Sequence, residues 1–161
     1  MNSYDVGDAV TVRAVFGGNV TELVSQMLAG ATTLTVLDAT GYTGTDTLIM
    51  EPGTAREERL TVSSVSGTTI TVTAASVYAH GVATAVWELA DPTAITLKVK
   101  DPNNHITTYT YALSEVTKDG TGRYSKSITI DQSGPWWYRW AGTGAVVAAS
   151  EMQLAVRRSE F

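Results

Sequence analysis

The 161-residue chain contains no cysteine and no apolar run long enough to cross a bilayer. The lack of cysteine excludes a disulfide framework, thiolate catalysis and metal sites ligated by cysteine. A membrane-spanning helix needs roughly 20 consecutive apolar residues, so we expect no membrane partner. The opening residues Met1–Asp5 also lack the basic and apolar regions of a signal peptide. The sequence therefore predicts synthesis in a reducing cytosol, with any later location reached by assembly or lysis.

Charged residues are scarce, at 17% of the chain, and the net charge is −5. Nucleic-acid phosphates are bound by patches of lysine and arginine, whereas the basic residues of this chain are scattered. The composition therefore argues against a nucleic-acid partner. Hydrophobic residues make up 43% of the chain, which is enough to bury the core of one or two small domains.

Residues that could carry catalysis are few, and His80 and His105 are the only histidines. His105 follows the turn Asp101–Asn104 and is expected to be solvated, and the His80 ring is expected to hold a turn by bonding the backbone. Glu57 and Glu58 are adjacent, so on a strand they point to opposite faces and cannot form the paired carboxylates of a glycosidase. We expect no catalytic residue, no metal site and no cofactor.

What the chain has in abundance is threonine and valine in alternating segments. The clearest is 94–100, in which apolar residues occupy one face and polar residues the other, and 32–37 and 68–73 alternate likewise. A period of two is typical of strands with one buried and one solvated face. Turn-forming residues separate these segments, so the sequence predicts an all-β fold. The apolar face of segment 94–100 consists of Ile95, Leu97 and Val99.

The order of the segments indicates two modules, one inserted in the other. Residues 4–16 have the pattern of a first strand, but the next strand of the same type, 95–99, follows only after more than seventy residues. A stretch of this length with its own strands is best treated as a separate module. We therefore predict a discontinuous sandwich of residues 1–18 and 89–161, with a small β-domain, residues 28–88, inserted after the first strand.

The conformation of the connecting segment, residues 19–27, is open to two interpretations: a linker or a short helix. Asn19 followed by Glu22 has the spacing of a capping box, which favours a helix. Val20 and Thr21 are poor helix formers and favour an extended chain.

One segment near the C-terminus places aromatic residues on both faces of a strand. Trp136, Tyr138 and Trp140 alternate with Trp137 and Arg139. One face must fill the core, and the sequence leaves open which one. The other face is then covered by the inserted module or a neighbouring subunit, by local side chains, or by a stacked sugar ring. The residues from which we expect an interaction surface are Trp137, Tyr138, Arg139 and Trp140.

Short motifs in both modules resemble those of tailed-bacteriophage virion proteins. The outer module resembles immunoglobulin-like virion proteins in Val6–Asp8, Asp91–Thr93, the corner Asp119-x-x-Gly122-x-Tyr124, and Trp136–Gly144. The inner module resembles small β-modules of phage tail, neck and fibre proteins in Gly30–Val36, Ala39–Tyr42, Glu58–Val62, Ser66–Thr69 and Ala79–Gly81.

The resemblance implies an immunoglobulin-like β-sandwich with a small β-barrel-like domain inserted after its first strand. It implies a non-enzymatic structural component of a tailed-phage virion, assembled in the bacterial host cytoplasm, that docks to neighbouring subunits in the head–tail connection or tail. Its expected partners are other virion proteins and further copies of itself in a symmetric assembly. The alternatives are a capsid decoration protein on the head and a glycan-binding adhesion module.

Overall fold

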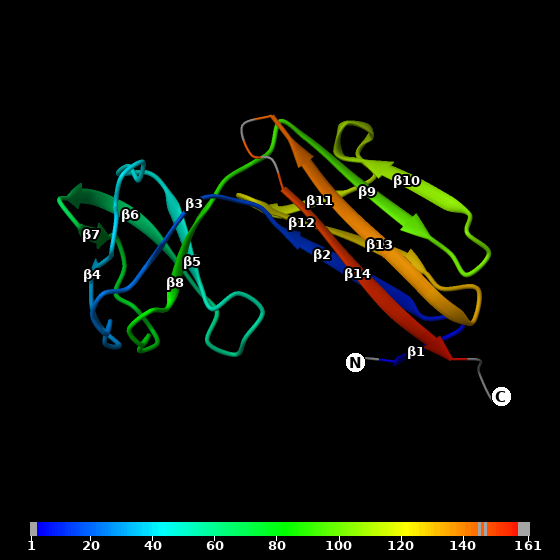
Figure 1. Cartoon of the computed structure of the whole chain (residues 1–161), viewed down its shortest axis with the longest axis horizontal. Helices are drawn as coiled ribbons and strands as arrows, with labels where there is room; N and C mark the ends of the chain where they lie inside the picture. Colours follow the sequence, from blue (N-terminus) through cyan, green and yellow to red (C-terminus); the bar gives the residue numbers. More distant parts are fainter. Residues whose placement is uncertain (1–2, 145, 147, 158–161) are drawn as a thin grey trace. The chain divides into compact units, whose positions relative to one another are not determined.

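The computed structural model describes residues 3–144, 146 and 148–157, and almost all of its regular structure is strand (Figure 1). Within these residues there are fourteen strands, one 3₁₀ turn at Tyr111–Leu113 and no α-helix. The all-β fold class predicted from the sequence is thus confirmed. No helix in the described ranges has the length and apolar character needed to cross a membrane.

The chain forms two compact units, each of which has its own core. The outer unit consists of Met1–Phe16 and Asp91–Phe161, and the inserted unit consists of Gly17–Ala90. The chain therefore passes from one unit to the other after Phe16 and returns after Ala90.

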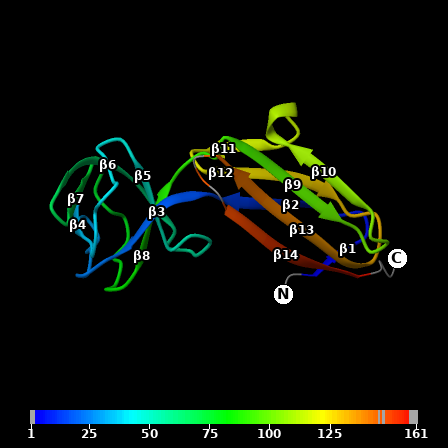
Figure 2. The same cartoon turned by 45° about the horizontal axis from the view of Figure 1, so that its top comes forward.

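The outer unit contains two sheets, drawn from two directions in Figure 1 and Figure 2. One has the strand order β1-β14-β13-β9-β10 and the other has the order β11-β12-β2. All neighbouring strands are antiparallel except β1 and β14, which are parallel. The strands are β1 (Ser3–Asp5), β2 (Ala9–Val15), β9 (Ala94–Lys100), β10 (Ile106–Thr110), β11 (Thr117–Gly120), β12 (Arg123–Thr129), β13 (Gly134–Thr143) and β14 (Ala148–Arg157).

Alternation along the strands gives each sheet of the outer unit a buried face, consistent with a β-sandwich. In β9, the apolar face expected from the sequence is buried and Lys98 on the opposite face is exposed. In β2, Val10 and Val12 are buried while Thr11 is exposed. Successive side chains of a pleated strand point to opposite faces. The alternation in the sequence therefore determines which side chains are buried and which are exposed.

The expectation of one strand over residues 4–16 is wrong, because the chain turns at Val6–Asp8. Gly7 has a φ of 103°, which a residue with a Cβ rarely adopts. Its N–H donates to the carbonyl of Ile130 (2.7 Å), and Asp8 Oδ2 accepts from the N–H of Asp5 (2.9 Å). The turn divides the segment into β1 and β2, which belong to different sheets. The insertion consequently follows the second strand and not the first.

The inserted unit is a six-stranded antiparallel sheet in the order β3-β8-β5-β6-β7-β4. A bridge between Leu23 and Val36 joins the ends of the first and last strands in this order. The N–H of Val24 donates to the backbone carbonyl of Thr35 (3.0 Å), and the N–H of Leu37 donates to the backbone carbonyl of Glu22 (2.9 Å). The strands are β3 (Gly17–Glu22), β4 (Thr33–Thr35), β5 (Thr47–Met50), β6 (Glu58–Ser66), β7 (Thr69–Val72) and β8 (Ala85–Leu89).

Residues 19–27 do not form a helix, and residues 19–22 adopt the extended conformation that Val20 and Thr21 favour. Their first four residues belong to β3, in which Val20 pairs with Trp87 and Thr21 pairs with Val86. β-Branched residues pack well on a pleated surface, and the partner strand β8 satisfies their backbone groups. The remaining residues run between the bridges at Leu23 and Met27 and belong to the inserted unit.

Candidate interaction surface

Strand β13 separates the aromatic residues into a buried face and an exposed face. Trp136 and Tyr138 are each 7% exposed and Trp140 is fully buried, so this face fills the core. Trp137 is 36% exposed, and Arg139 lies on the same outer face. Of the four residues expected to interact, the structure brings Trp137 and Arg139 to the surface and places Tyr138 and Trp140 in the core.

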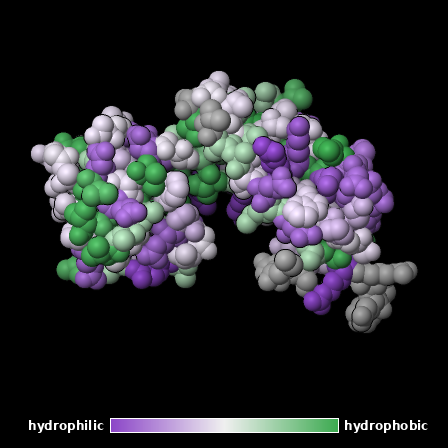
Figure 3. Space-filling view, in the orientation of Figure 1, coloured by the Kyte–Doolittle hydropathy of each residue, from purple (hydrophilic) through white to green (hydrophobic). Residues whose placement is uncertain are grey.

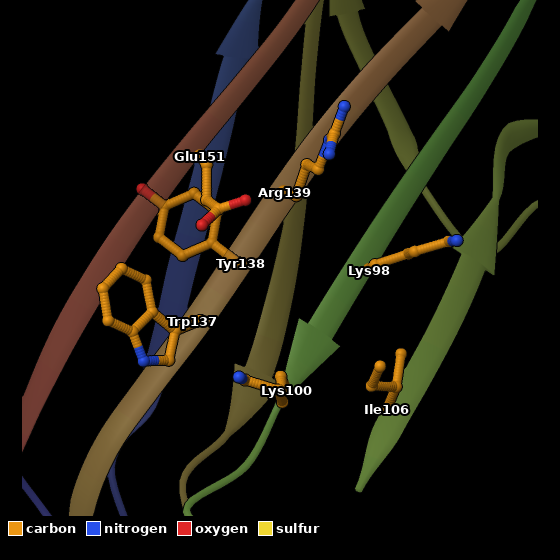
Figure 4. A pocket seen from close by; sticks show the side chains of 7 residues that line it. All are labelled: Lys98, Lys100, Ile106, Trp137, Tyr138, Arg139 and Glu151. Carbon is orange, nitrogen blue, oxygen red and sulfur yellow. The ribbon is translucent and has the colours of Figure 1, made fainter. Parts of the chain in front are cut away.

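A hollow of about 390 Å³ lies on the outer face of the five-stranded sheet, beside Trp137. Figure 4 shows it from close by, with Trp137 and Arg139 on β13 and two lysines on β9. The strand register places Trp137 opposite Lys100 and places Arg139 between Lys98 and Glu151. We call this area the Trp137 surface. Its lining residues are Lys98, Lys100, Ile106, Trp137, Tyr138, Arg139 and Glu151.

A second hollow of about 380 Å³ continues along the same sheet face, where Thr96 and Ala141 lie opposite each other. Lys98 and Arg139 line both hollows. Lys98 and Arg139 therefore lie between the two hollows on the face formed by β9 and β13. In Figure 3, hydrophilic side chains are visible on both units, mixed with hydrophobic ones.

The Trp137 surface carries more positive than negative charge. Lys98, Lys100 and Arg139 contribute three cations, and Glu151 is the one acidic residue of the lining. Within the described part of the chain none of the three cations forms an ion pair. Trp137 and Ile106 add exposed apolar area beside them. Aromatic residues and arginine are enriched where proteins bind other proteins, so this face has the composition of a contact surface.

A second polar arrangement, at Asp91, ties distant parts of the outer unit together. Asp91 Oδ1 accepts from the N–H of Gly122 and from the hydroxyl of Tyr124, both at 2.8 Å, and Oδ2 lies 2.6 Å from Lys118 Nζ. Burial raises the pKa of Asp91, but the hydrogen bonds from Lys118, Gly122 and Tyr124 outweigh it and hold the pKa below its ordinary value. Asp91 thus fixes the corner that precedes β12.

The inserted unit contains a polar cluster around the buried side chain of His80. Its Nδ1 lies 3.0 Å from Glu51 Oε1 and its Nε2 lies 2.8 Å from Glu58 Oε2, with the ring fully buried. The expectation that the ring bonds the backbone is wrong, since both nitrogens contact carboxylates. Both ring nitrogens therefore have a hydrogen-bond partner, and the ring links the two glutamates.

The hydrogen bonds of the His80 cluster connect separate segments of the inserted unit and give the cluster a structural role. Glu58 accepts from Ser76 Oγ (3.1 Å) and from the N–H of Val77, so it holds the segment after β7. A catalytic triad needs the histidine between the serine and the acid, whereas here Glu58 lies between Ser76 and His80. The sequence does not predict the cluster, because its members come from three segments that lie far apart along the chain.

His105 lies where the sequence predicts, exposed after a turn. Its N–H donates to Asp101 Oδ1 (2.8 Å). Among the described residues, no group of three or more histidine or acidic side chains is arranged to hold a metal ion.

Comparisons with known proteins give no match: no family model fits the chain, and neither a curated protein nor a solved structure is significantly similar to it. The fold and the surface therefore define the chain as an all-β protein of two units with an exposed cationic and aromatic sheet face.

Proposed function

We propose that the chain is a non-enzymatic structural component of a tailed-phage virion, which docks to neighbouring subunits in the head–tail connection or tail. The observation that carries the proposal is the Asp91 corner. Asp91, Gly122 and Tyr124 belong to the motifs that resemble phage virion proteins. Asp91 accepts hydrogen bonds from both of the others, although they lie 31 and 33 positions away along the chain.

The topology of both units adds support. In the outer unit, β14-β13-β9-β10 faces β11-β12-β2, which matches the G-F-C-C′ and D-E-B order of variable-type immunoglobulin sandwiches. In the inserted unit, the bridge between Leu23 and Val36 links the edge strands of the sheet, as in a small barrel. These features favour an immunoglobulin-like sandwich with a barrel-like insertion.

The placement of the histidines favours a role without catalysis. The ring nitrogens of His80 are both engaged by carboxylates in the core of the inserted unit. The exposed residues of the outer unit instead offer sheet faces and strand edges, which are the parts that subunits of an assembly use to pair and pack.

The test is whether purified particles contain the chain. Virions of the phage that encodes it, purified by density gradient, should contain it in a fixed ratio to their major subunits when measured by quantitative mass spectrometry. Deletion of the gene should arrest assembly at one step. Immunogold label at the neck or tail supports the proposal, and label over the head surface supports the capsid decoration alternative. Absence of the chain from purified particles overturns both.

A glycan-binding adhesion module is the second candidate, and the hollow beside the exposed Trp137 favours it. The flat face of a tryptophan can stack on a sugar ring, and the neighbouring charged groups can bond hydroxyls. A glycan array probed with the wild type and with Trp137→Ala tests this function. Trp87→Ala is the matched control, because Trp87 is similarly exposed (41%) but lies in the inserted unit. No binding by the wild type removes this candidate.

A further inference from the structure

The formal charge of the chain is divided unequally between the two units. The inserted unit contains seven acidic residues and two basic ones, Arg56 and Arg59, so with neutral histidine it has a formal charge of −5. The outer unit contains nine acidic and nine basic residues and is formally neutral. The whole net charge of the chain therefore belongs to the insertion. Its acidic residues are Glu22, Asp38, Asp46, Glu51, Glu57, Glu58 and Glu88.

Three of these carboxylates lie in segments next to Tyr42. Asp38 and Asp46 are four residues before and after it, and the Tyr42 hydroxyl donates to the carbonyl of Val86 (3.0 Å), two residues before Glu88. Burial and the negative charges of Glu88, Asp38 and Asp46 raise the pKa of Tyr42 to about 12. We call the three carboxylates the acidic cluster. In the described ranges none of them forms an ion pair.

Hydrogen bonds within the inserted unit fix the acidic cluster in place. Asp38 accepts from the N–H of Thr40 (2.8 Å), Asp46 accepts from Thr43, and Glu88 accepts from Asn19 Nδ2 (2.7 Å). These neutral donors orient the carboxylates without cancelling their charge. The cluster is therefore a preorganised negative surface.

The Trp137 surface has the opposite character. Lys98, Lys100 and Arg139 are cations without an ion-pair partner in the described chain, and they border Trp137 and Ile106, which is 55% exposed. Contact between two Trp137 surfaces would bring like charges together, and so would contact between two acidic clusters. Like charges that meet across an interface oppose binding, so the two surfaces complement each other and not themselves.

We propose that the Trp137 surface of one copy binds the acidic cluster on the inserted unit of a second copy. The inference rests on the proposed role as an assembling subunit and names both the surface and the partner. Because the two surfaces differ, the contact is head to tail, and each copy retains one free surface of each kind. Repetition of such a contact produces a ring if the rotation closes and a filament if it does not.

Two variants with one disabled surface each provide the test. Lys98→Gln with Arg139→Gln weakens the cationic surface. Asp38→Asn, Asp46→Asn and Glu88→Gln remove the charge of the acidic cluster but keep an oxygen to accept the hydrogen bonds. By sedimentation velocity, the wild type should self-associate, and salt should weaken the association by screening. Each variant alone should associate at least about tenfold more weakly.

The decisive measurement is an equimolar mixture of the two variants. One still has its acidic cluster and the other still has its cationic surface, so the mixture should form dimers and no larger species. Arg13→Gln with Arg59→Gln is the control, because it removes the same charge from exposed positions elsewhere and should leave association unchanged. Thermal melts check that each variant is folded.

A wild type that stays monomeric overturns the inference, as do variants that associate normally or a mixture that forms no dimers. These results are separate from the test of the proposed function. A monomeric chain found in purified virions refutes the head-to-tail contact and leaves the virion role in place. A chain that self-associates as described but is absent from virions refutes the virion role.

Discussion

Nε2 of His80 lies 2.8 Å from Oε2 of Glu58, and both side chains are buried in the inserted unit. Glu58 begins β6, and His80 forms a bridge with Met27 through its backbone. The contact therefore connects the sheet to two segments that have little regular structure. Loss of either side chain should therefore weaken this unit.

Replacing His80 by alanine should strongly destabilise the inserted unit. The change removes a buried hydrogen-bond partner of the Glu58 carboxylate, and leaving a buried polar group unsatisfied typically costs about 1–3 kcal/mol, or more when the group is charged. Urea unfolding followed by fluorine NMR of fluorotryptophan measures this, because Trp87 is the sole tryptophan of residues 17–90. His105→Ala, at an exposed position, should change stability by less than about 0.5 kcal/mol. Equal effects of the two substitutions would contradict the role assigned to the cluster.

The stability of the inserted unit should fall in acid because of Glu58. Burial raises the pKa of Glu58, but hydrogen bonds from Val77, His80 and Ser76 outweigh it and keep the pKa below the ordinary value of 4.5. A carboxyl whose folded pKa is depressed contributes stability above its unfolded pKa and loses it as the pH falls through the folded value. The free energy of unfolding should therefore decline as the pH is lowered from about 4.5. Glu58→Gln should flatten this decline, and an unchanged slope would refute the assignment.

Removing the Asp91 carboxylate should destabilise the outer unit more than removing its lysine partner. Asp91→Ala leaves the N–H of Gly122 and the hydroxyl of Tyr124 without an acceptor, which should cost about 2 kcal/mol. Lys118→Ala should cost less than about 1 kcal/mol, because the ion pair is partly exposed. Urea unfolding monitored on the tryptophans of β13 compares the two. A double-mutant cycle of Asp91→Ala with Tyr124→Phe should show coupling between the two side chains.

The two faces of β13 should respond differently to truncation. Trp140 is fully buried, so Trp140→Ala should cost about 3–5 kcal/mol of stability. Trp137→Ala should leave the outer unit nearly as stable but reduce any binding at the Trp137 surface. Thermal unfolding and a binding assay on both variants separate the effects, and a large loss of stability with Trp137→Ala would contradict the assignment of faces.

A methyl group at Gly142 should destabilise the outer unit. A Cβ at this position would lie 2.7 Å from Pro92 Cγ and 2.8 Å from Phe16 Cε1. Overpacking of this kind typically costs about 1–3 kcal/mol. Gly81→Ala is the matched control, because its Cβ would meet nothing within 4 Å and its backbone does not require glycine. We expect the melting temperature to fall for Gly142→Ala and to stay nearly constant for Gly81→Ala.

The part of the fold that local patterns encode could be predicted from the sequence. The alternation in 94–100 identified β9 and its buried face, because the side-chain period of a strand depends only on neighbouring residues. The aromatic segment identified a strand but not its core face, since both faces carry large rings. That choice depends on which other sheet packs against the strand, and Trp136, Tyr138 and Trp140 proved to be the buried set.

Features that depend on distant partners could not be derived in this way. Glu51 and Glu58 lie 29 and 22 positions from His80 and carry no local sign that they meet it. The capping-box spacing at Asn19 favoured a helix, but pairing with β8 made this segment a strand. The division of residues 4–16 into β1 and β2 likewise depends on Gly7 and on its bond to Ile130.

The first and last strands of the inserted unit lie in one ladder, in which Gly17 pairs with Leu89. The polypeptide thus enters and leaves this unit at neighbouring points. A segment whose ends meet can be spliced into a host loop, or removed from it, without stretching the host. Replacing the inserted unit between Phe16 and Asp91 by another domain would therefore change the net charge of the protein and leave the fold of the outer unit intact.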